Sequence, residues 1–298
     1  MPVYRIFVLV FLFSLFSLQI IAQGDNDVMS VDSSIVVVNA SVIDGSGRAV
    51  AGLERKLFRI LEDGVEQKID TFSSEETPFA AVILLDTSGS MEDRVSLARA
   101  AAIQFLDGLR VDDFVAIYNF DSKVKLVQDF SNSRDIRDQV YDLKSDGMTV
   151  LNDAVYKAGE LLAKRPEKRK AIVILSDGAD TQSSKSADKA LQMALAGGAT
   201  IYSVDMSAIN DNSVGRRTNQ GVLKNFADKT GGKFIATPGG QAMREAFRSI
   251  VGEIGVQYTI AYAPSNLTKD GKWRTIEVRV ARPNLTIRTR KGYKAPKK

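Results

Sequence analysis

The chain has 298 residues, 44% of them hydrophobic and 26% charged, so it can bury a sizeable core and is not a disordered segment. It contains no cysteine and no histidine, which excludes disulfides, thiolate or histidine catalysis and cysteine or histidine metal sites. The net charge is +4, but from Arg282 onward the sequence holds seven bases and no acid. A basic tail on a mildly acidic body does not favour a nucleic-acid partner.

Residues 1–22 have the pattern of a secretory signal peptide. Arg5 is the only charged residue there, residues 6–21 are almost wholly apolar, and Ala22 is a small residue before a polar run. We therefore expect the rest of the chain to lie outside the cytoplasm, as a secreted or periplasmic protein. The alternative is an uncleaved membrane anchor, because the apolar stretch is about long enough to span a thinned bilayer.

Residues 23–78 are predicted to form an N-terminal β-strand region. Apolar, β-branched residues indicate strands at 35–43, 57–61 and 65–72. Asp63 and Gly64 separate the last two strands, which is a strong signal for a tight hairpin turn.

The sequence pattern differs in residues 79–255, where short apolar strands alternate with helical patterns. The expected strands lie at 80–85, 113–120, 170–176, 199–205 and 233–236. The expected helices lie at 93–109, 133–143, 151–164, 186–196, 221–229 and 241–253. This alternation predicts an α/β domain, Rossmann-like, with a mostly parallel sheet flanked by helices.

Residues 256–298 return to strands, with period-two alternation at 256–262, 276–280 and 285–287. A few strands on either flank would make only a marginal sheet. We therefore expect the N- and C-terminal strands to combine into one small β-sandwich, into which the α/β domain is inserted.

Three loops of the α/β domain carry the residues with metal-binding chemistry. Asp86, Ser88 and Ser90 follow the strand at 80–85, Thr149 precedes a predicted helix, and Asp177 follows the strand at 170–176. A parallel sheet would bring these loops to its carboxyl edge, where ligands bind in such folds. Two acids and three hydroxyls suit a small hard cation, Mg²⁺ or Mn²⁺ ahead of Ca²⁺. Because the hydroxyls neutralise little of its charge, such a cation would attract a carboxylate from outside.

This set of residues resembles the metal-ion-dependent adhesion site of the von Willebrand factor A domain family. The resemblance implies that Ser88, Ser90 and Thr149 are direct or near-direct metal ligands. It implies that Asp86 and Asp177 act directly or through water. It also implies a function in adhesion, in which the metal captures an acidic residue of a protein partner, with no catalytic residue and no organic cofactor.

The flanks are similar to those of a group of secreted bacterial A-domain proteins. The similar segments are EDGVEQKIDTF at 62–72, YTIAYAPS at 258–265, DGKWRTIEVRV at 270–280 and RKGY at 290–293. This similarity leaves the partner and the oligomeric state open.

The sequence thus predicts a non-enzymatic protein-binding module. One alternative is a structural component of the envelope or of a surface assembly, in which the metal site is vestigial. Another is a metal-dependent hydrolase, although no general base is visible besides the acids at the site. For Asp86 and Asp177 alone, the alternative role is capping of the helices that follow.

Two basic segments are expected to have no specific role. The run of bases at 164–170 is interpreted as a solvated helix end. The basic C-terminal tail is expected to be a solubilising or frayed end, the alternative being a docking patch for anionic envelope polymers.

Overall fold

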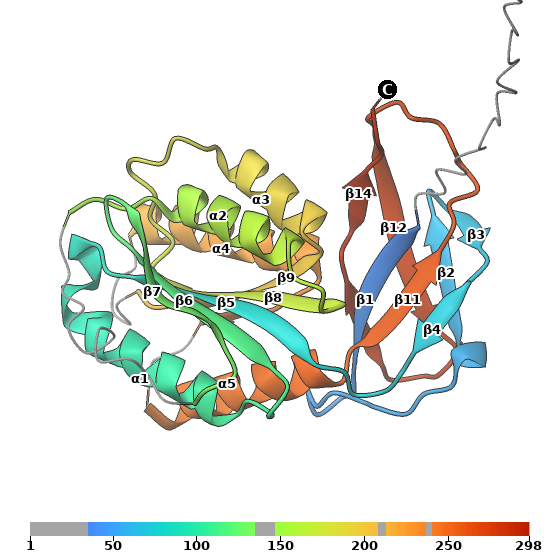
Figure 1. Ribbon diagram of the computed structural model, residues 1–298, viewed down its shortest axis with the longest axis horizontal. Helices are drawn as coiled ribbons and strands as arrows, with labels where there is room; N and C mark the ends of the chain where they lie inside the picture. Colours follow the sequence, from blue (N-terminus) through green and yellow to red (C-terminus); the bar gives the residue numbers. More distant parts are fainter. Residues whose placement is uncertain (1–34, 135–146, 208–212, 237–239, 298) are drawn as a thin grey trace, which may run out of the picture. The chain divides into compact units, whose positions relative to one another are not determined.

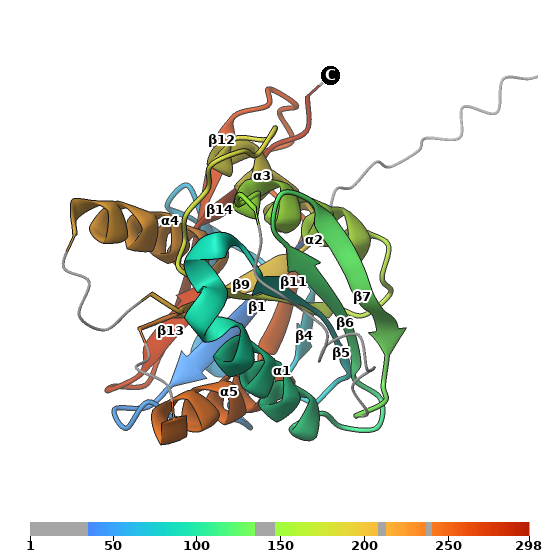
Figure 2. The ribbon, with the colours of Figure 1, turned by 90° about the vertical axis from the view of Figure 1, so that its left-hand side faces the viewer.

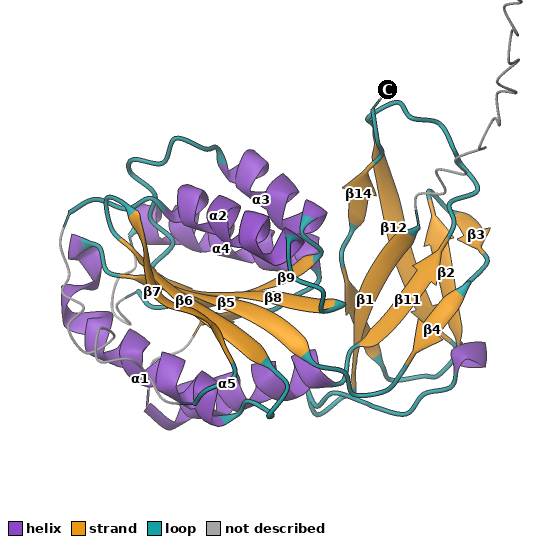
Figure 3. Ribbon diagram, viewed as in Figure 1, coloured by secondary structure: helices purple, strands orange, loops and turns teal. Residues whose placement is uncertain are grey.

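The computed structural model describes residues 35–134, 147–207, 213–236 and 240–297. Within these ranges the chain forms a six-stranded sheet covered by helices and two four-stranded sheets (Figures 1 and 3). The six-stranded sheet has the order β10-β9-β8-β5-β6-β7, in which all neighbours are parallel except β6 and β7. Its strands are β5 (Phe79–Asp86), β6 (Phe114–Phe120), β7 (Val124–Ser131), β8 (Arg169–Ser176), β9 (Ala199–Asp205) and β10 (Phe234–Ala236). The expected mostly parallel α/β sheet is confirmed.

Helices cover both faces of this sheet, which is why its central strands are uninterrupted apolar runs. The helical segments are η2 (Gly89–Arg94), α1 (Val95–Asp107), α2 (Leu151–Ala163), α3 (Ala187–Ala196), α4 (Val214–Thr230) and α5 (Gly240–Gly255). Helices α1 and α5 pack on one face, against Ala81, Ile83 and Leu85 of β5. Helices α2, α3 and α4 pack on the other face, on the side of Val82 and Leu84 (Figure 2).

The two smaller sheets pack face to face as a β-sandwich, and each contains strands from both ends of the chain. One has the order β13-β1-β11-β4 and the other β14-β12-β2-β3. Their strands are β1 (Val36–Ile43), β2 (Phe58–Glu62), β3 (Val65–Gln67), β4 (Thr71–Ser73), β11 (Tyr258–Tyr262), β12 (Trp273–Val280), β13 (Thr286–Thr289) and β14 (Gly292–Lys294); a short 3-10 turn, η1 (Arg55–Leu57), precedes β2. The core between the sheets includes Phe58 and Tyr258, whose ring centroids are 4.8 Å apart. The predicted sandwich of N- and C-terminal strands is confirmed.

Several elements differ from those predicted. Strands β7 and β14 were not expected, and the single strand predicted at 65–72 is two strands, β3 and β4, that belong to different sheets. Helix α4 begins at Val214 instead of 221, because the Ser213 hydroxyl caps it by accepting a hydrogen bond from the Arg216 backbone N–H. Most of the helix predicted at 133–143 lies outside the described residues.

The interpretation of the basic segments was wrong in part. Arg169 has no exposed surface, and the guanidinium of Arg165 lies over the rings of Phe114 and Phe130, so the run at 164–170 is not simply solvated. In the C-terminal segment, β13 and β14 are paired strands, and Arg288 forms an ion pair with the buried Glu253. The part of the tail up to Lys294 is therefore structural and not frayed.

Candidate metal site

The predicted metal-binding residues lie on three loops at the carboxyl edge of the parallel sheet. Asp86 is the last residue of β5, and Asp177 directly follows β8, which pairs with β5 in parallel. Thr149 lies two residues before α2. The alternation of strand and helix thus places all three loops at the same edge, as expected for ligand sites in open α/β sheets.

Asp86 is the buried centre of the first loop, with no exposed surface. Its Oδ1 accepts hydrogen bonds from the backbone N–H of Ser88, at 2.9 Å, and from the Ser88 hydroxyl, at 2.6 Å. Its Oδ2 accepts one from the Ser176 hydroxyl at 2.5 Å. Burial and, to a smaller extent, the nearby charge of Asp177 raise the pKa of Asp86 to about 6, against the lowering effect of these hydrogen bonds. A buried carboxyl of this kind would be held in its ionised form by a cation beside it.

Backbone and side-chain hydrogen bonds join the three loops to one another. The Gly89 N–H donates to the Gly147 carbonyl at 3.2 Å, which links the first loop to the second. The Thr149 N–H donates to the Thr181 hydroxyl at 2.9 Å, which links the second loop to the segment after β8. The bond from Ser176 to Asp86 links the third loop to the first. The loops that carry Asp86, Ser88, Ser90, Thr149 and Asp177 are therefore held together.

The donor set at this edge fits a hard cation. The hydroxyl oxygens of Ser88 and Ser90 are 3.2 Å apart, and Ser88 and Thr149 are buried while Ser90 is exposed, so the group opens toward solvent on one side. Among the described residues, no group of three or more acidic side chains is placed to hold a metal ion by itself. A cation here would therefore depend on hydroxyls together with Asp86 and Asp177, and such a set suits Mg²⁺ or Mn²⁺.

Helix capping does not account for these residues. Ser88 is the N-cap of η2 and Val150 is the N-cap of α2, and neither makes a side-chain capping hydrogen bond. The two helices that follow Asp177 in the described chain, α3 and α4, are capped by Ser186 and Ser213. The carboxylates of Asp86 and Asp177 instead accept hydrogen bonds within their own loops.

Three supporting hydroxyls, those of Ser176, Ser122 and Thr181, were missed by the sequence analysis. Ser176 is fully buried and donates to Asp86, and its signal was its place as the last residue of β8 beside Asp177. Ser122 accepts a hydrogen bond from the Met148 N–H at 3.1 Å and no sequence signal marked it. A Cβ at Gly147 would lie 2.4 Å from the Ser122 hydroxyl, and Gly147 has a φ of +74°, so the second loop requires glycine here.

A second Asp-x-Ser group follows β9 and has the same local geometry. Oδ1 of Asp205 accepts hydrogen bonds from the backbone N–H of Ser207, at 2.9 Å, and from its hydroxyl, at 2.6 Å. However, Oδ2 of Asp205 is bound by the Gln220 amide at 2.6 Å, and the Arg216 guanidinium lies 3.6 Å away. This carboxylate is already neutralised by a side chain of the protein, so Ser207 offers a matched control for Ser88.

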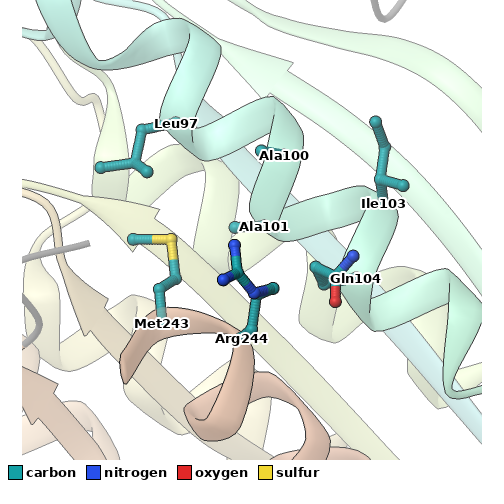
Figure 4. Close-up of a pocket in the computed structure, with 7 residues that line it drawn as sticks. All are labelled: Leu97, Ala100, Ala101, Ile103, Gln104, Met243 and Arg244. Atoms are coloured by element: carbon teal, nitrogen blue, oxygen red, sulfur yellow. The ribbon is translucent and has the colours of Figure 1, made fainter. Parts of the chain in front are cut away.

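A hollow of about 290 Å³ lies between α1 and α5 and has a different character (Figure 4). It is lined mainly by apolar side chains, among them Leu97, Ile103 and Met243, with Gln104 and Arg244 as its polar members. It contains no carboxylate and offers no hard-cation site.

Comparison with known proteins agrees with this architecture. Within this α/β domain, residues 81–179 match the family described as von Willebrand factor type A domain. Residues 81–179 therefore belong to a von Willebrand factor type A domain. The matched segment includes all five predicted site residues: Asp86, Ser88, Ser90, Thr149 and Asp177.

More distant likenesses extend beyond this segment. The uncharacterized protein sll0103 of Synechocystis sp. strain PCC 6803 is 27% identical over an alignment of 168 positions, which covers 54% of this chain and 38% of that protein. A von Willebrand factor type A structure from Catenulispora acidiphila is 16% identical with a TM-score of 0.48, over 89% of this chain and 75% of that one. The PilB minor pilin of Streptococcus sanguinis is 15% identical with a TM-score of 0.47, over 61% of this chain and 62% of that one. The chain thus spans well under half the length of the Synechocystis protein, and these likenesses identify neither a ligand nor a partner.

Among the helices in the described part of the chain, none combines the length and apolar character needed to cross a membrane.

Proposed function

We propose that this chain is a non-enzymatic binding module that holds Mg²⁺ or Mn²⁺ at the three loops and captures an acidic residue of a protein partner. Asp86, Ser88, Ser90, Thr149 and Asp177 would hold the cation. When bound, the cation would supply a positive charge that only two carboxylates of the protein offset. The protein would be secreted or periplasmic, with residues 1–22 as a signal peptide, 79–255 as the binding domain and the flanks 23–78 and 256–298 as its β-region.

The observation that supports this proposal most directly is the environment of Asp86. Its carboxylate is fully buried where three loops meet, and hydroxyl groups form two of its three hydrogen bonds. A hydroxyl that donates to a carboxylate can at the same time offer a lone pair to a cation. The Ser88 hydroxyl is placed to do so, because it contacts both Asp86 and the hydroxyl of the exposed Ser90.

The first test is Mn²⁺ binding by the purified protein, measured by titration calorimetry and by the loss of the free-ion electron paramagnetic resonance signal. We expect one Mn²⁺ per chain in the wild type, at least about tenfold weaker binding for Ser88→Ala, and none for Asp86→Ala. Ser207→Ala removes a hydroxyl with the same local hydrogen bonds and should bind Mn²⁺ like the wild type. If Ser88→Ala binds Mn²⁺ unchanged, or if the wild type binds none, the metal site as proposed here is wrong.

The second test concerns the partner's acid and uses acetate as the probe. With Mn²⁺ bound to the protein, the proton signal of the acetate methyl group should broaden, because a carboxylate that reaches the paramagnetic ion relaxes faster. Acetate with protein and Mg²⁺ gives the diamagnetic baseline, and Asp86→Ala with Mn²⁺ corrects for free ion. Broadening no greater than that of the Asp86→Ala sample would show that no carboxylate reaches the metal.

A further inference from the structure

The C-terminal β-region carries an excess of positive charge. Residues 256–298 contain 11 bases and two acids, against a net charge of +4 for the whole chain. Arg279 and Arg288 form ion pairs with glutamates, and Arg274 pairs with Asp270. Four lysines lie close together at one end of the sandwich: Lys269, Lys272, Lys294 and Lys297. Of these, Lys272 forms an ion pair with Asp270 at 3.9 Å.

Hydrogen bonds fix the segment that carries these lysines. We call residues 266–273 and 294–297 the sandwich tip. The Gly271 N–H donates to the Pro296 carbonyl at 3.0 Å, and the Ala295 N–H donates to the Lys272 carbonyl at 2.8 Å, so the two parts of the tip are joined. The Arg274 guanidinium donates to the Thr268 carbonyl at 3.2 Å and to the Asp270 carboxylate at 3.1 Å. The acid within the tip, Asp270, is therefore shared between the buried guanidinium of Arg274 and the more distant ammonium of Lys272, and this single carboxylate offsets only part of the positive charge of the tip.

Two apolar side chains are exposed at the sandwich tip. Leu267 is 75% exposed and lines a shallow hollow together with Lys269 and Lys297. Trp273 is 38% exposed and lies opposite Lys294 in the antiparallel pair of β12 and β14. The ring of Trp273 lies against Gly292, where a Cβ would come within 2.7 Å of it, so its position is fixed. The tip thus combines lysines with an exposed leucine and a partly exposed tryptophan in an ordered segment.

We propose that the sandwich tip is a peripheral docking surface for an anionic lipid bilayer. Lysines at a bilayer surface gain from anionic headgroups, and their aliphatic stems can lie along the apolar boundary. Leucine gains by entering that boundary, and tryptophan prefers the headgroup level. A soluble polyanion would satisfy the lysines but would give Leu267 and Trp273 nothing to bury against, which is why a lipid surface fits the tip better.

This surface is separate from the proposed metal site. Arg169, the first residue of β8, donates to the carbonyls of Gly255 and Gln257, which lead into strand β11 of the sandwich, whereas the metal-site loops follow the other end of β5 and β8. Docking through the tip and capture through the metal site would not compete for the same residues. The inference therefore goes beyond the proposed function and does not depend on it.

The test is cosedimentation of the purified protein with vesicles in the presence of a chelator, so that no metal bridges the protein to phosphate. We expect binding to equimolar phosphatidylglycerol and phosphatidylcholine and none to phosphatidylcholine alone. Trp273 is the only tryptophan in the sequence, so its emission should shift to shorter wavelength when the tip binds. Added salt should weaken the binding, because the attraction is screened.

Two variants and two matched controls make the test specific. Lys294→Gln combined with Lys297→Gln should weaken binding about 25-fold, at roughly fivefold per lysine. Lys157→Gln combined with Lys164→Gln removes the same charge from exposed positions in α2 and at its C-cap, and should have little effect. Leu267→Ser should weaken binding about tenfold, whereas Leu126→Ser, at a leucine of β7 that is 54% exposed, should not.

Three results would each overturn the proposal. They are equal binding to neutral and anionic vesicles, equal losses in the tip variants and their controls, and absence of binding to either vesicle. A soluble anionic polymer such as polyphosphate serves as a further arm. If it binds as tightly as the vesicles and Leu267→Ser leaves vesicle binding unchanged, the tip is a polyanion site and not a lipid surface.

Discussion

At the scale of single residues, the candidate site is organised by one buried carboxylate and the hydroxyls around it. Asp86 could not stay buried without its donors, because an unpaired charge loses its hydration on burial. Ser88 follows from the local sequence, but Ser176 comes from a strand that is 90 residues away. The third loop therefore helps to position Asp86 in the first loop, in addition to supplying Asp177.

We predict that Ser176→Ala lowers the affinity for Mn²⁺ about tenfold, although Ser176 need not contact the ion. Its hydroxyl donates to Oδ2 of Asp86 at 2.5 Å, and loss of an outer partner of a metal ligand typically weakens binding by this amount or more. Ser203→Ala is the control, because Ser203 is equally buried on the next strand and its hydroxyl has no hydrogen-bond partner among the described residues. Calorimetric titration with Mn²⁺ gives the affinities of both variants. Equal affinities of Ser176→Ala and Ser203→Ala would mean that Ser176 does not position Asp86.

The residues of the candidate site could be predicted from the sequence, but the hydrogen-bond partners that hold them in place could not. Asp86 and Asp177 stand out because each follows an apolar run, and the carboxyl end of a parallel strand has a known place in the fold. The partners Ser176, Ser122 and Thr181 could not be recognised in the same way. Serine and threonine are common in loops, and only the packing of distant segments selects the few that form these hydrogen bonds.

At the scale of elements, the end of α4 shows how the α/β domain and the sandwich fit together. Helix α4 ends at Thr230, and its C-cap residue Gly231 has a φ of +82°. A Cβ there would lie 2.3 Å from the backbone of Thr289 in β13, and the Lys291 N–H donates to the Lys229 carbonyl at 3.0 Å. Glycine thus serves both as the left-handed helix end and as the point of closest approach to the sandwich.

We predict that Gly231→Ala lowers the free energy of unfolding by about 3 kcal/mol, since the left-handed conformation and the backbone collision both oppose it. Gly198→Ala, just after α3, should cost only about 1 kcal/mol. Gly198 has a similar φ of +72°, but nothing lies within 4 Å of a Cβ added there. Urea unfolding followed by circular dichroism separates the two effects, and equal midpoints would show that β13 yields to the added methyl group.

Elements whose burial pattern is regular could be predicted from the sequence, and those set by tertiary pairing could not. Strand β5 is an uninterrupted buried run, and the hairpin of β2 and β3 was marked by Asp63 and Gly64, both of which have positive φ. Strand β7 was missed because it lies at the sheet edge with a mixed, partly exposed pattern. The split between β3 and β4 was missed because the chain crosses from one sheet to the other around the buried Ile69.

At the scale of the whole described molecule, the α/β domain interrupts a sandwich whose sheets need both ends of the chain. The chain leaves the sandwich through residues 74–78 and returns to it through 256–257, so two connecting segments pass between the two parts. Arg169 reaches both segments. It donates to the Glu75 carbonyl at 2.5 Å, to the Gly255 carbonyl at 2.5 Å and to the Gln257 carbonyl. Burial lowers the pKa of Arg169 to about 10, which still leaves the guanidinium charged at neutral pH.

One buried guanidinium donates to carbonyls of both connecting segments. Its loss should therefore loosen the junction between the α/β domain and the sandwich more than it loosens the core of either part. We predict that Arg169→Met lowers the free energy of unfolding by about 3 kcal/mol, since it leaves buried carbonyls without donors. It should also make the segments around Glu75 and Gln257 the first sites of limited proteolysis, because the two parts then open at the junction. Arg169→Lys should fall between Arg169→Met and the wild type, since a lysine keeps the charge but cannot reach three carbonyls with a fixed fork.

Lys168→Met is the matched control, because the Lys168 side chain is exposed and the substitution removes the same charge one residue away. We expect its unfolding midpoint and its proteolytic fragments to match those of the wild type. Mass spectrometry of the fragments shows where cleavage begins. Cleavage of Arg169→Met that begins inside the sandwich or the α/β domain, with the connecting segments still protected, would mean that Arg169 supports a core and not the junction between the two parts.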